Sequence, residues 1–497
     1  MSRYVSPREA RRRFPTLSPR GPPGAGGIGG SGGTGSGSSG RAEGAPSSPA
    51  PPTAAAAASS DSSSSSSEQA SARPSLKGAI VYSDGQFDDA RLCLALAQTA
   101  AAAGARVANY AEVTRLMRDE ATGKVVGAYV RDALAGPGGK EIPVRAKVVV
   151  NAAGPFADEV RRMVGAAADP NDGSKKTKKK KNSSASASPP PPFRKMIQPS
   201  SGVHVTLPDY YSPSDTGLIV PKTADGRVVF LLPWHDATIA GTTDAPCAVE
   251  ALPRATEAEV AFILDAVKPY LTVAVRRSDV QSAWSGVRPL AADPDAEDTA
   301  STSRDHVVAV DPRSGLVTVA GGKWTTYRAM ARDAVDAAVA AGALAAARGC
   351  STAALPLVGA AGWSRALFAE VAQAYTVPHR PGAIDTRVAR HLARSYGGRA
   401  RLVTQLAEDE GLGRRLARGH PELEAEVAYA ARHEMCETAV DFVARRTRLA
   451  FVDVAATEQA LPRVLEIMAR EKGWGFWRRR RERERAEAFL QTFKGGM

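Results

Sequence analysis

The sequence predicts an α/β (α+β) chain with a split first domain, a mostly antiparallel sheet domain and a C-terminal helical domain. Two segments that combine a strand, a small-residue turn and a helix, NAAGPFAD and AGGKWTTYR, stand about 170 residues apart. Strand patterns fill much of the segment between them. From about residue 340 onward, Ala, Arg, Leu and Glu recur at helical spacing. This order places one α/β pattern before the sheet segment and another after it.

The chain begins with a tract that contains a decoy glycine motif. GAGGIGG at residues 24–30 matches G-x-G-x-x-G, the fingerprint of dinucleotide-binding folds. A working motif needs a buried strand before it and a helix after it, and neither flank has such a pattern. Gly, Ser, Ala and Pro dominate this tract, and Ser, Ala and Pro again follow the lysine-rich run at residues 175–181. Such runs bury too little apolar surface to become ordered. We therefore predict low-complexity inserts at 20–75 and 166–192.

Composition and charge exclude several classes of protein. The net charge is +13, but the lysines at 175–181 have no interleaved aromatics or recognition helix, which favours a solvated loop over nucleic-acid binding. No apolar run approaches the length of a membrane span, so any membrane contact is expected to be peripheral. Four cysteines without CxxC spacing argue against a disulfide framework or a zinc site and for a reducing compartment: Cys93, Cys247, Cys350 and Cys436.

A second basic run, WRRRRERER, lies in the C-terminal helical pattern beside Trp474, Phe476 and Trp477. Arginines next to aromatic residues can face acidic lipid headgroups. A charged solvent face next to core aromatics is the simpler interpretation, and the sequence slightly favours it.

An α/β pattern starts at residue 76. LKGAIVYSDGQ predicts a short strand, and FDDARLCLALAQTAAAAG predicts a helix with acids in its first turn and Gly104 at its end. ARVANYAEVTRLM and GKVVGAYVRD predict further strands. EIPVRAKVVVNAAG predicts a strand that ends in the buried run VVVNAAG, and PFADEVRRMVG predicts a helix directly behind it.

The pattern changes after the lysines to successive strands. These are MIQPSSGVHVTLP, GLIVPKT, RVVFLLPWHDATIAGTTD and, after a helix at about 257–270, VQSAWSGVRPL. HVVAVDPRSGLVTVAGGKWTTYRAMARDAVDAAVAAG then predicts a hairpin, a buried strand, a glycine turn and a long helix.

These motifs together resemble the FAD-dependent glycerol-3-phosphate dehydrogenases, which pass electrons to quinone. The resemblance rests on DGQFDDARLCLALAQTAAAAGARVANYAEVTRL, VVNAAGPFAD, PSSGVHVTLP, LLPWHDATIAGTTDAP, SAWSGVRPL and VAGGKWTTYRAMARDAVDAAV, in family order. It implies a split FAD/NAD(P)-binding Rossmann-like domain, an antiparallel-sheet substrate domain and a C-terminal helical domain. The implied bounds are 76–165 and 306–340 for the FAD-binding domain, 193–305 for the substrate domain and 341–497 for the helical domain; residues 1–19 resemble an interior family segment.

The resemblance also implies which residues contact FAD. The segment at 111–113, ending in Val113, matches the backbone that receives the adenine. The turn at 151–154 matches the one beside the ribose and phosphates, and the turn at 321–325 matches the one under the flavin's pyrimidine edge. The expected contacts are Val113, Asn151, Ala153, Gly154, Gly321, Gly322, Lys323, Trp324 and Thr325. No metal site is expected.

Three residues match the family's substrate-binding and catalytic positions. Arg288 in GVRPL and Lys323 in GGKWT match cations that bind the phosphate of glycerol 3-phosphate, and a guanidinium can take two phosphate oxygens at once. His204 in SGVHVTLP is the candidate proton acceptor at the C2 hydroxyl, since an imidazole suits that role near neutral pH. A strand histidine is as often a structural residue, so both interpretations of His204 stay open. His235 and Asp244 also match family text and are interpreted as structural.

The chain departs from the family at its start. The family's first strand, glycine turn and helix, which hold the FAD pyrophosphate, are expected before residue 1, so this chain is expected to be an incomplete form with weak or no FAD binding. One alternative is a non-catalytic remnant that binds a partner. Another is a flavin oxidase of the same fold that acts on an amine, although two cations suit a phosphate better.

The family also implies partners and a location. We expect glycerol 3-phosphate as substrate, quinone as electron acceptor and a peripheral position on the mitochondrial inner membrane, although no import signal is visible. Homo-oligomers are left open. No EF-hand pattern occurs, so calcium control is not expected.

Overall fold

The computed structural model describes residues 2–20, 75–165, 193–220, 228–292, 302–303, 305–375 and 384–495. These residues form two compact units, one from 1–82 and 268–274 and the other from 83–267 and 275–497. The decoy glycines at 24–30 and the lysines at 175–181 lie outside the described residues.

The smaller unit joins segments that stand far apart in the sequence. Strand β1 (Arg3–Val5) pairs antiparallel with β2 (Ala79–Val81). Helix α1 (Pro7–Arg13) follows β1 directly, because the Ser6 side chain caps its first turn and proline suits the first helical position. Behind α1, the backbone amide of Ser18 bonds to the carbonyl of Tyr270 at 2.7 Å.

The larger unit is built around an antiparallel sheet in the order β13-β12-β7-β10-β9-β8, with β11 paired to β7. Its strands are β7 (Ile197–Leu207), β8 (Leu218–Val220), β9 (Val229–Trp234), β10 (Ala237–Gly241), β11 (Ala245–Pro246), β12 (Ser282–Ala292) and β13 (Thr302–Ser303). Helix α4 (Glu257–Val267) packs on β7 and β9. Val203, Val205 and Leu207 of β7 are fully buried, and because side chains alternate along a strand, His204 points to the opposite face.

The segment RVVFLLPWHDATIAGTTD forms a hairpin rather than one strand. Strands β9 and β10 pair antiparallel, with Ala237 opposite Trp234. The two turn residues are His235 and Asp236, with φ of 48° and 56°. A two-residue hairpin with both φ values positive matches the twist of its strands, and glycine or asparagine usually fills it. Without either residue, the sequence carried no strong signal for this turn.

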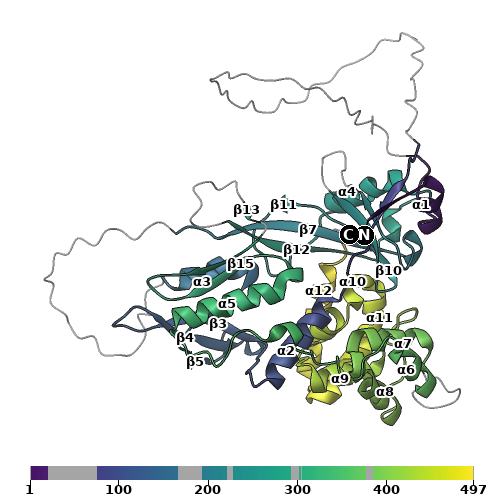
Figure 1. Ribbon diagram of the computed structural model, residues 1–497. Coiled ribbons are helices and arrows are strands. Elements are labelled where there is room, and N and C mark those ends of the chain that lie inside the picture. Colours follow the sequence, from purple (N-terminus) through teal and green to yellow (C-terminus); the bar gives the residue numbers. More distant parts are fainter. Residues whose placement is uncertain are drawn as a thin grey trace, which may run out of the picture. The chain divides into compact units, whose positions relative to one another are not determined.

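A second sheet has the order β14-β15-β6 and contains a parallel pair. Its strands are β14 (His306–Val310), β15 (Val317–Gly321) and β6 (Val150–Asn151), and β15 runs parallel to β6. Helices α3 (Ala157–Met163) and α5 (Tyr327–Ala341) start just after β6 and β15, and both pack on this sheet (Figure 1). The prediction that VVVNAAG is a fully buried strand is wrong: β6 has two residues and Val150 is 43% exposed, because in the described residues β6 has a neighbouring strand on one side.

A third sheet and helix α2 complete this part of the unit. The sheet contains β3 (Ala111–Arg118), β4 (Val125–Asp132) and β5 (Glu141–Arg145), all antiparallel. Helix α2 (Asp89–Ala102) is capped by the side chain of Asp88, and Gly104 just beyond it has a φ of 96°. Both ends of this helix are therefore where the sequence predicts them.

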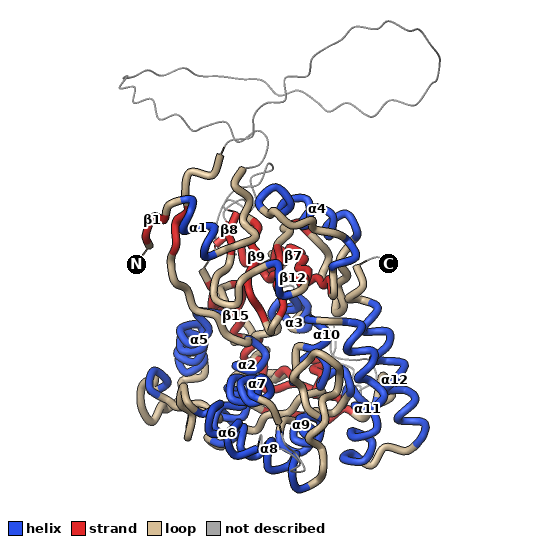
Figure 2. Tube along the Cα trace, turned by 90° about the vertical axis from the view of Figure 1, so that its right-hand side faces the viewer, coloured by secondary structure: helices blue, strands red, loops and turns tan. Residues whose placement is uncertain are grey.

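The C-terminal region is helical, as predicted (Figure 2). It contains a large cluster of buried apolar side chains. Its helices are α6 (Leu367–Tyr375), α7 (Thr386–Tyr396), α8 (Ala400–Asp409), α9 (Glu424–His433), α10 (Leu449–Val452), α11 (Val454–Lys472) and α12 (Phe476–Gln491), with a π-helix at Asp441–Arg446. Phe442 and Leu465 lie at 0% exposure in this core. Among the described residues, every helix is too short or too polar to cross a membrane.

A buried ion pair ties α2 to the helical region. The two terminal nitrogens of Arg91 donate to the two carboxylate oxygens of Glu434 at 2.9 and 2.8 Å, and the Arg91 Nε donates to the carbonyl of Ser395. The guanidinium also lies 4.3 Å from the ring centre of Tyr396. Because the exposed fractions of Arg91 and Glu434 are 12% and 1%, water screens this pair little.

Candidate functional site

The two turns that the sequence singles out lie side by side. Val317 of β15 pairs with Val150 of β6, and Thr318 pairs with Asn151, in parallel register. Since both strands run in the same direction, the turns at 151–154 and 321–325 leave the same edge of the sheet. A helix begins after each turn, and this edge is where open α/β sheets bind nucleotides.

The first turn is fixed by Asn151. Its buried side chain donates to the carbonyl of Ala157 at 2.9 Å and accepts from the amide of Ala153 at 3.3 Å. Asn151 therefore shapes the turn, while Ala153 is exposed. Gly154 has a φ of 57° and open space where a Cβ would stand, so the backbone at this point is accessible to a ligand.

The second turn needs its two glycines for different contacts. At Gly321, with φ of 70°, a Cβ would stand 2.7 Å from the Cβ of Ala291 on β12. At Gly322, with φ of 80°, it would stand 2.6 Å from the sulfur of Met330. This packing joins the end of β15 to the end of β12 and leaves Lys323, Trp324 and Thr325 exposed beyond it.

Val113 belongs to a different sheet from the two turns. It belongs to β3 in the third sheet, where it pairs with Val130 and is 37% exposed. The described contacts of α3 include both β3 and β15, so this sheet borders the same region.

His204 lies on β7 in a closely packed aromatic group. Its ring stacks on Trp284 of β12 at 4.5 Å between ring centres, and Phe230 lies at 5.7 Å. Gly241 leaves space for it, since a Cβ there would stand 2.5 Å from the imidazole Cδ2. Burial and the positive charge of Arg288 lower the pKa of His204 to about 4, so the ring is neutral near pH 7. Its buried Nδ1 has no hydrogen-bond partner among the described residues.

Arg288 lies on β12, on the same face as His204. Its Nη1 donates to the carbonyls of Ser201 and Thr243 and approaches Asp244 at 3.3 Å, and its Nη2 donates to the Thr242 hydroxyl. A guanidinium has five N–H groups, and none of these bonds uses the one on Nε. Since the side chain remains 32% exposed, Arg288 is held in place and still able to meet an anion.

The residues present fit FAD at the edge formed by the two turns. Gly154 has open space where a Cβ would stand, so backbone rather than a side chain faces this edge there, and the positive φ of Gly321 and Gly322 lets the chain turn at the end of β15. The amides at the starts of α3 and α5 lie just behind and favour negative charge. The structure thus brings the candidate FAD residues of both turns together, and it brings His204 and Arg288 together on the neighbouring sheet face.

The sequence missed the residues that support this face. Trp284 stacks on His204, and Thr242, Thr243 and Asp244 surround the Arg288 guanidinium. GTTD was noted only as a motif, because nothing in the sequence shows that β10 and β12 both flank β7. Asp244, interpreted as structural from the sequence, lies 3.3 Å from Arg288 Nη1.

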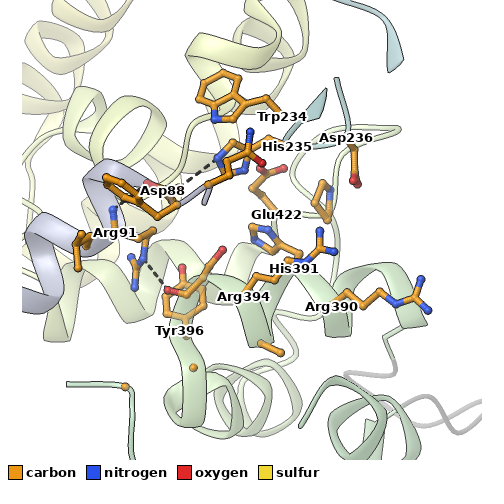
Figure 3. A pocket seen from close by; sticks show the side chains of 18 of the residues that line it. Asp88, Arg91, Trp234, His235, Asp236, Arg390, His391, Arg394, Tyr396 and Glu422 are labelled. Atoms are coloured by element: carbon orange, nitrogen blue, oxygen red, sulfur yellow. Dashed lines mark hydrogen bonds and ion pairs between the residues drawn. The ribbon is translucent and has the colours of Figure 1, made fainter. Parts of the chain in front are cut away.

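A cavity of about 1560 Å³ lies between α2, the β9–β10 turn and α7 (Figure 3). None of the candidate site residues lines it. His235 Nε2 lies 3.3 Å from the Asp88 carboxylate at its wall. Burial opposes ionisation of Asp88, but the hydrogen bond and charge of His235 outweigh it and lower the pKa of Asp88 to about 2. The structural interpretation of His235 agrees with this contact, which links the hairpin to the cap of α2.

At the wall of the cavity, a buried ion pair joins α7 to α9. His391 Nε2 lies 2.8 Å from Glu426 Oε1, and the Tyr396 hydroxyl donates to the same oxygen at 2.9 Å. Burial disfavours the charged imidazole, but Glu426 outweighs it and raises the pKa of His391 to about 9.

Comparison with protein families matches most of the chain. The model described as "FAD dependent oxidoreductase" matches residues 54–328. The model described as "C-terminal domain of alpha-glycerophosphate oxidase" matches residues 350–479.

Individual relatives agree with these models. A mitochondrial glycerol-3-phosphate dehydrogenase of Arabidopsis thaliana is 51% identical over 84% of this chain, and that of Mus musculus is 46% identical over 84%. The chain spans 63% of the plant relative and 54% of the mouse relative. A solved glycerol-3-phosphate dehydrogenase from Bacillus halodurans, complexed with FAD, superposes with a TM-score of 0.65 at 29% identity, covering 84% of this chain and 76% of that one. The predicted fold class is confirmed by these matches.

Proposed function

The chain belongs to the FAD-dependent oxidoreductase family, among the glycerol-3-phosphate dehydrogenases, and from this premise we propose that it oxidises sn-glycerol 3-phosphate to dihydroxyacetone phosphate. The observation that carries the proposal is the shared face of β7 and β12, where a neutral imidazole and a guanidinium lie, together with the packing of Gly321 on Ala291 at the end of β12. Bound FAD supplies the two-electron acceptor for the C2 hydride.

The residues of this face have separate tasks in the proposal. Arg288 and Lys323 bind the phosphate of the substrate. Two cations suit a phosphate, which has two negative charges, better than they suit a carboxylate, which has one. His204 takes the proton of the C2 hydroxyl, which its neutral ring can accept. Trp284, stacked on the imidazole, keeps that ring in one orientation. The turns at 151–154 and 321–325 hold the cofactor through backbone amides.

We further propose that the electrons pass to quinone and that the protein is mitochondrial and associates with the inner membrane. The support is that the plant and animal relatives are named mitochondrial glycerol-3-phosphate dehydrogenases. Quinone is proposed as the acceptor because the FAD-dependent glycerol-3-phosphate dehydrogenases, which the sequence resembles, pass their electrons to quinone.

The visible spectrum of the purified chain, after incubation with FAD and desalting, tests the oxidation. A retained flavin band that bleaches on addition of glycerol 3-phosphate, and not of glycerol or glycine, is the expected result. Glycerol controls for the phosphate and glycine for an amine substrate. Bleaching by glycine would favour the amine oxidase alternative, and absence of retained flavin would contradict activity of this chain.

A further inference from the structure

The turn between α11 and α12 exposes two large aromatic side chains. Phe476 is 73% exposed and Trp477 is 75% exposed, the two highest fractions among the large apolar side chains that the structure describes. Their rings contact each other edge to face at 5.2 Å. Trp474, two residues earlier, packs against the helical core. The sequence-based preference for core aromatics is therefore wrong for Phe476 and Trp477, since only Trp474 faces inward.

Two glycines place these rings at a convex corner. Gly473 ends α11 in the left-handed region, with φ of 64°, and its amide bonds to the carbonyl of Ala469. Gly475 then caps α12 in an extended conformation, so Phe476 and Trp477 are the first two helical residues. The helices α11 and α12 pack on each other behind the corner (Figure 2). We call residues 473–481 the aromatic corner.

The charges at this corner oppose the usual pattern of a helix start. Arg478 to Arg481 follow the aromatic pair, and the first turn contains no acid. Cations at the positive end of a helix dipole are destabilising, so this arrangement needs another reason. Arg478 pairs with Glu482 and Arg480 with Glu484, both at 2.9 Å.

Two of the four arginines have no such partner. Arg479 and Arg481 form no ion pair with any residue that the structure describes. Arg463 and, more weakly, Arg479 hold the pKa of Glu466 below its usual value, whereas Arg481 is exposed. The corner therefore presents exposed aromatic surface next to an excess of positive charge.

We propose that the aromatic corner docks on a membrane rich in anionic phospholipids. Phe476 and Trp477 enter the boundary between headgroups and acyl chains, where amphipathic rings are favoured. The arginines meet the lipid phosphates around them. A convex corner with two adjacent rings suits a deformable lipid surface, whereas a protein partner of comparable affinity would need a shaped pocket for each ring.

This inference names a surface for the membrane association proposed above, and it does not depend on flavin chemistry. Its test uses co-sedimentation of the full chain with vesicles of phosphatidylcholine alone or mixed with phosphatidylglycerol. We expect binding to the mixed vesicles only, and binding should weaken as salt is raised.

Variants localise the contact. The double variants F476S/W477S and R479E/R481E should each lower the vesicle partition coefficient by about tenfold or more. W363S is the matched control, because Trp363 is a described tryptophan, 54% exposed, outside the corner. Its binding should equal that of the unmodified chain. All four altered corner side chains are surface residues or lie next to solvent, so circular dichroism should not change and the melting temperature should not fall. In R479E/R481E it should rise slightly, because acids replace cations near the start of α12.

A positional measurement completes the test. Acyl chains brominated near the headgroup should quench part of the tryptophan fluorescence, and W477F should remove that part. Absence of binding to the mixed vesicles overturns the inference. Binding that F476S/W477S leaves unchanged overturns the named surface while membrane association stands. Either result is independent of whether the chain retains FAD.

Discussion

Gly202 of β7 lies directly opposite Gly286 of β12. On one side of this pair His204 faces Trp284, and on the other Ser200 faces Arg288. The two glycines leave a strip of sheet without side chains between the imidazole and the start of the arginine side chain. The guanidinium lies over Gly202, two residues from His204, or about 7 Å along the strand. A three-carbon phosphate fits such a strip in length.

Alanine at position 202 should weaken substrate binding. The added methyl group would stand 2.3 Å from Arg288 Nη2, so the guanidinium must move from its position. Loss of one charged hydrogen bond predicts a rise in KM for glycerol 3-phosphate of about tenfold or more, measured by flavin reduction. Gly138→Ala, just before β5 and outside this face, is the matched control, since a Cβ at Gly138 would meet nothing within 4 Å. Equal KM values for the two variants would contradict the assignment of this face.

His204→Asn should affect the chemical step rather than binding. Asparagine fills similar space but does not accept a proton, so kcat should fall by about 10²–10⁴-fold while KM changes little. Rapid mixing with substrate and observation of flavin bleaching separates the two constants. A kcat close to that of the unmodified chain would show that His204 is the structural strand histidine of the alternative interpretation.

Removing one partner of the Arg91–Glu434 pair should destabilise the protein strongly. Arg91→Met leaves a carboxylate buried without its counter-ion, which costs about 3–5 kcal/mol. The midpoint of urea unfolding should fall accordingly, and E434L in the same chain should recover part of the loss. Arg401→Met is the control: its pair with Glu370 is exposed at 48% and 54%, so about 0–1 kcal/mol is expected.

The same stability should depend on pH through two histidines, with opposite signs. His391 has a folded pKa of about 9, above its unfolded value of 6.5, so its stabilisation is complete below pH 6.5 and is lost as pH rises through 9. His204 has a folded pKa of about 4, so its stabilisation is complete above pH 6.5 and is lost as pH falls toward 4.

Melting temperatures at successive pH values check both signs. Each histidine contributes at most about 1.4 kcal/mol per pH unit within its own window. His391→Gln should flatten the alkaline limb, and His204→Asn should flatten the acid limb. An alkaline limb that is equally steep in His391→Gln would contradict the charged pair with Glu426.

The sequence predicted what local patterns determine. Asp88 and Gly104 mark the two ends of α2 through capping rules, and the segment that forms β7 was predicted as a strand. The resemblance also predicted that the turns after β6 and β15 meet. Strand register was not predictable, because nothing local sets Gly202 opposite Gly286. The turn at His235 and Asp236 was missed since those residues adopt positive φ less often than glycine or asparagine. The exposure of Phe476 was not predictable from its hydrophobic side chain, because it depends on how Gly473 and Gly475 orient the chain between α11 and α12.

The parallel pairing of β6 and β15 delays part of the folding of the chain during its synthesis. The hydrogen-bonded residues Asn151 and Thr318 are 167 positions apart, so the ribosome must make the whole intervening sheet domain before β6 meets β15. At typical synthesis rates that interval lasts roughly 10–30 s. During it the nascent chain carries an open strand edge and half of a cofactor cradle. Pulse-labelled chains in this interval should be the species that chaperones retain, and the β6–β15 pair should form late, in one step, when β15 arrives.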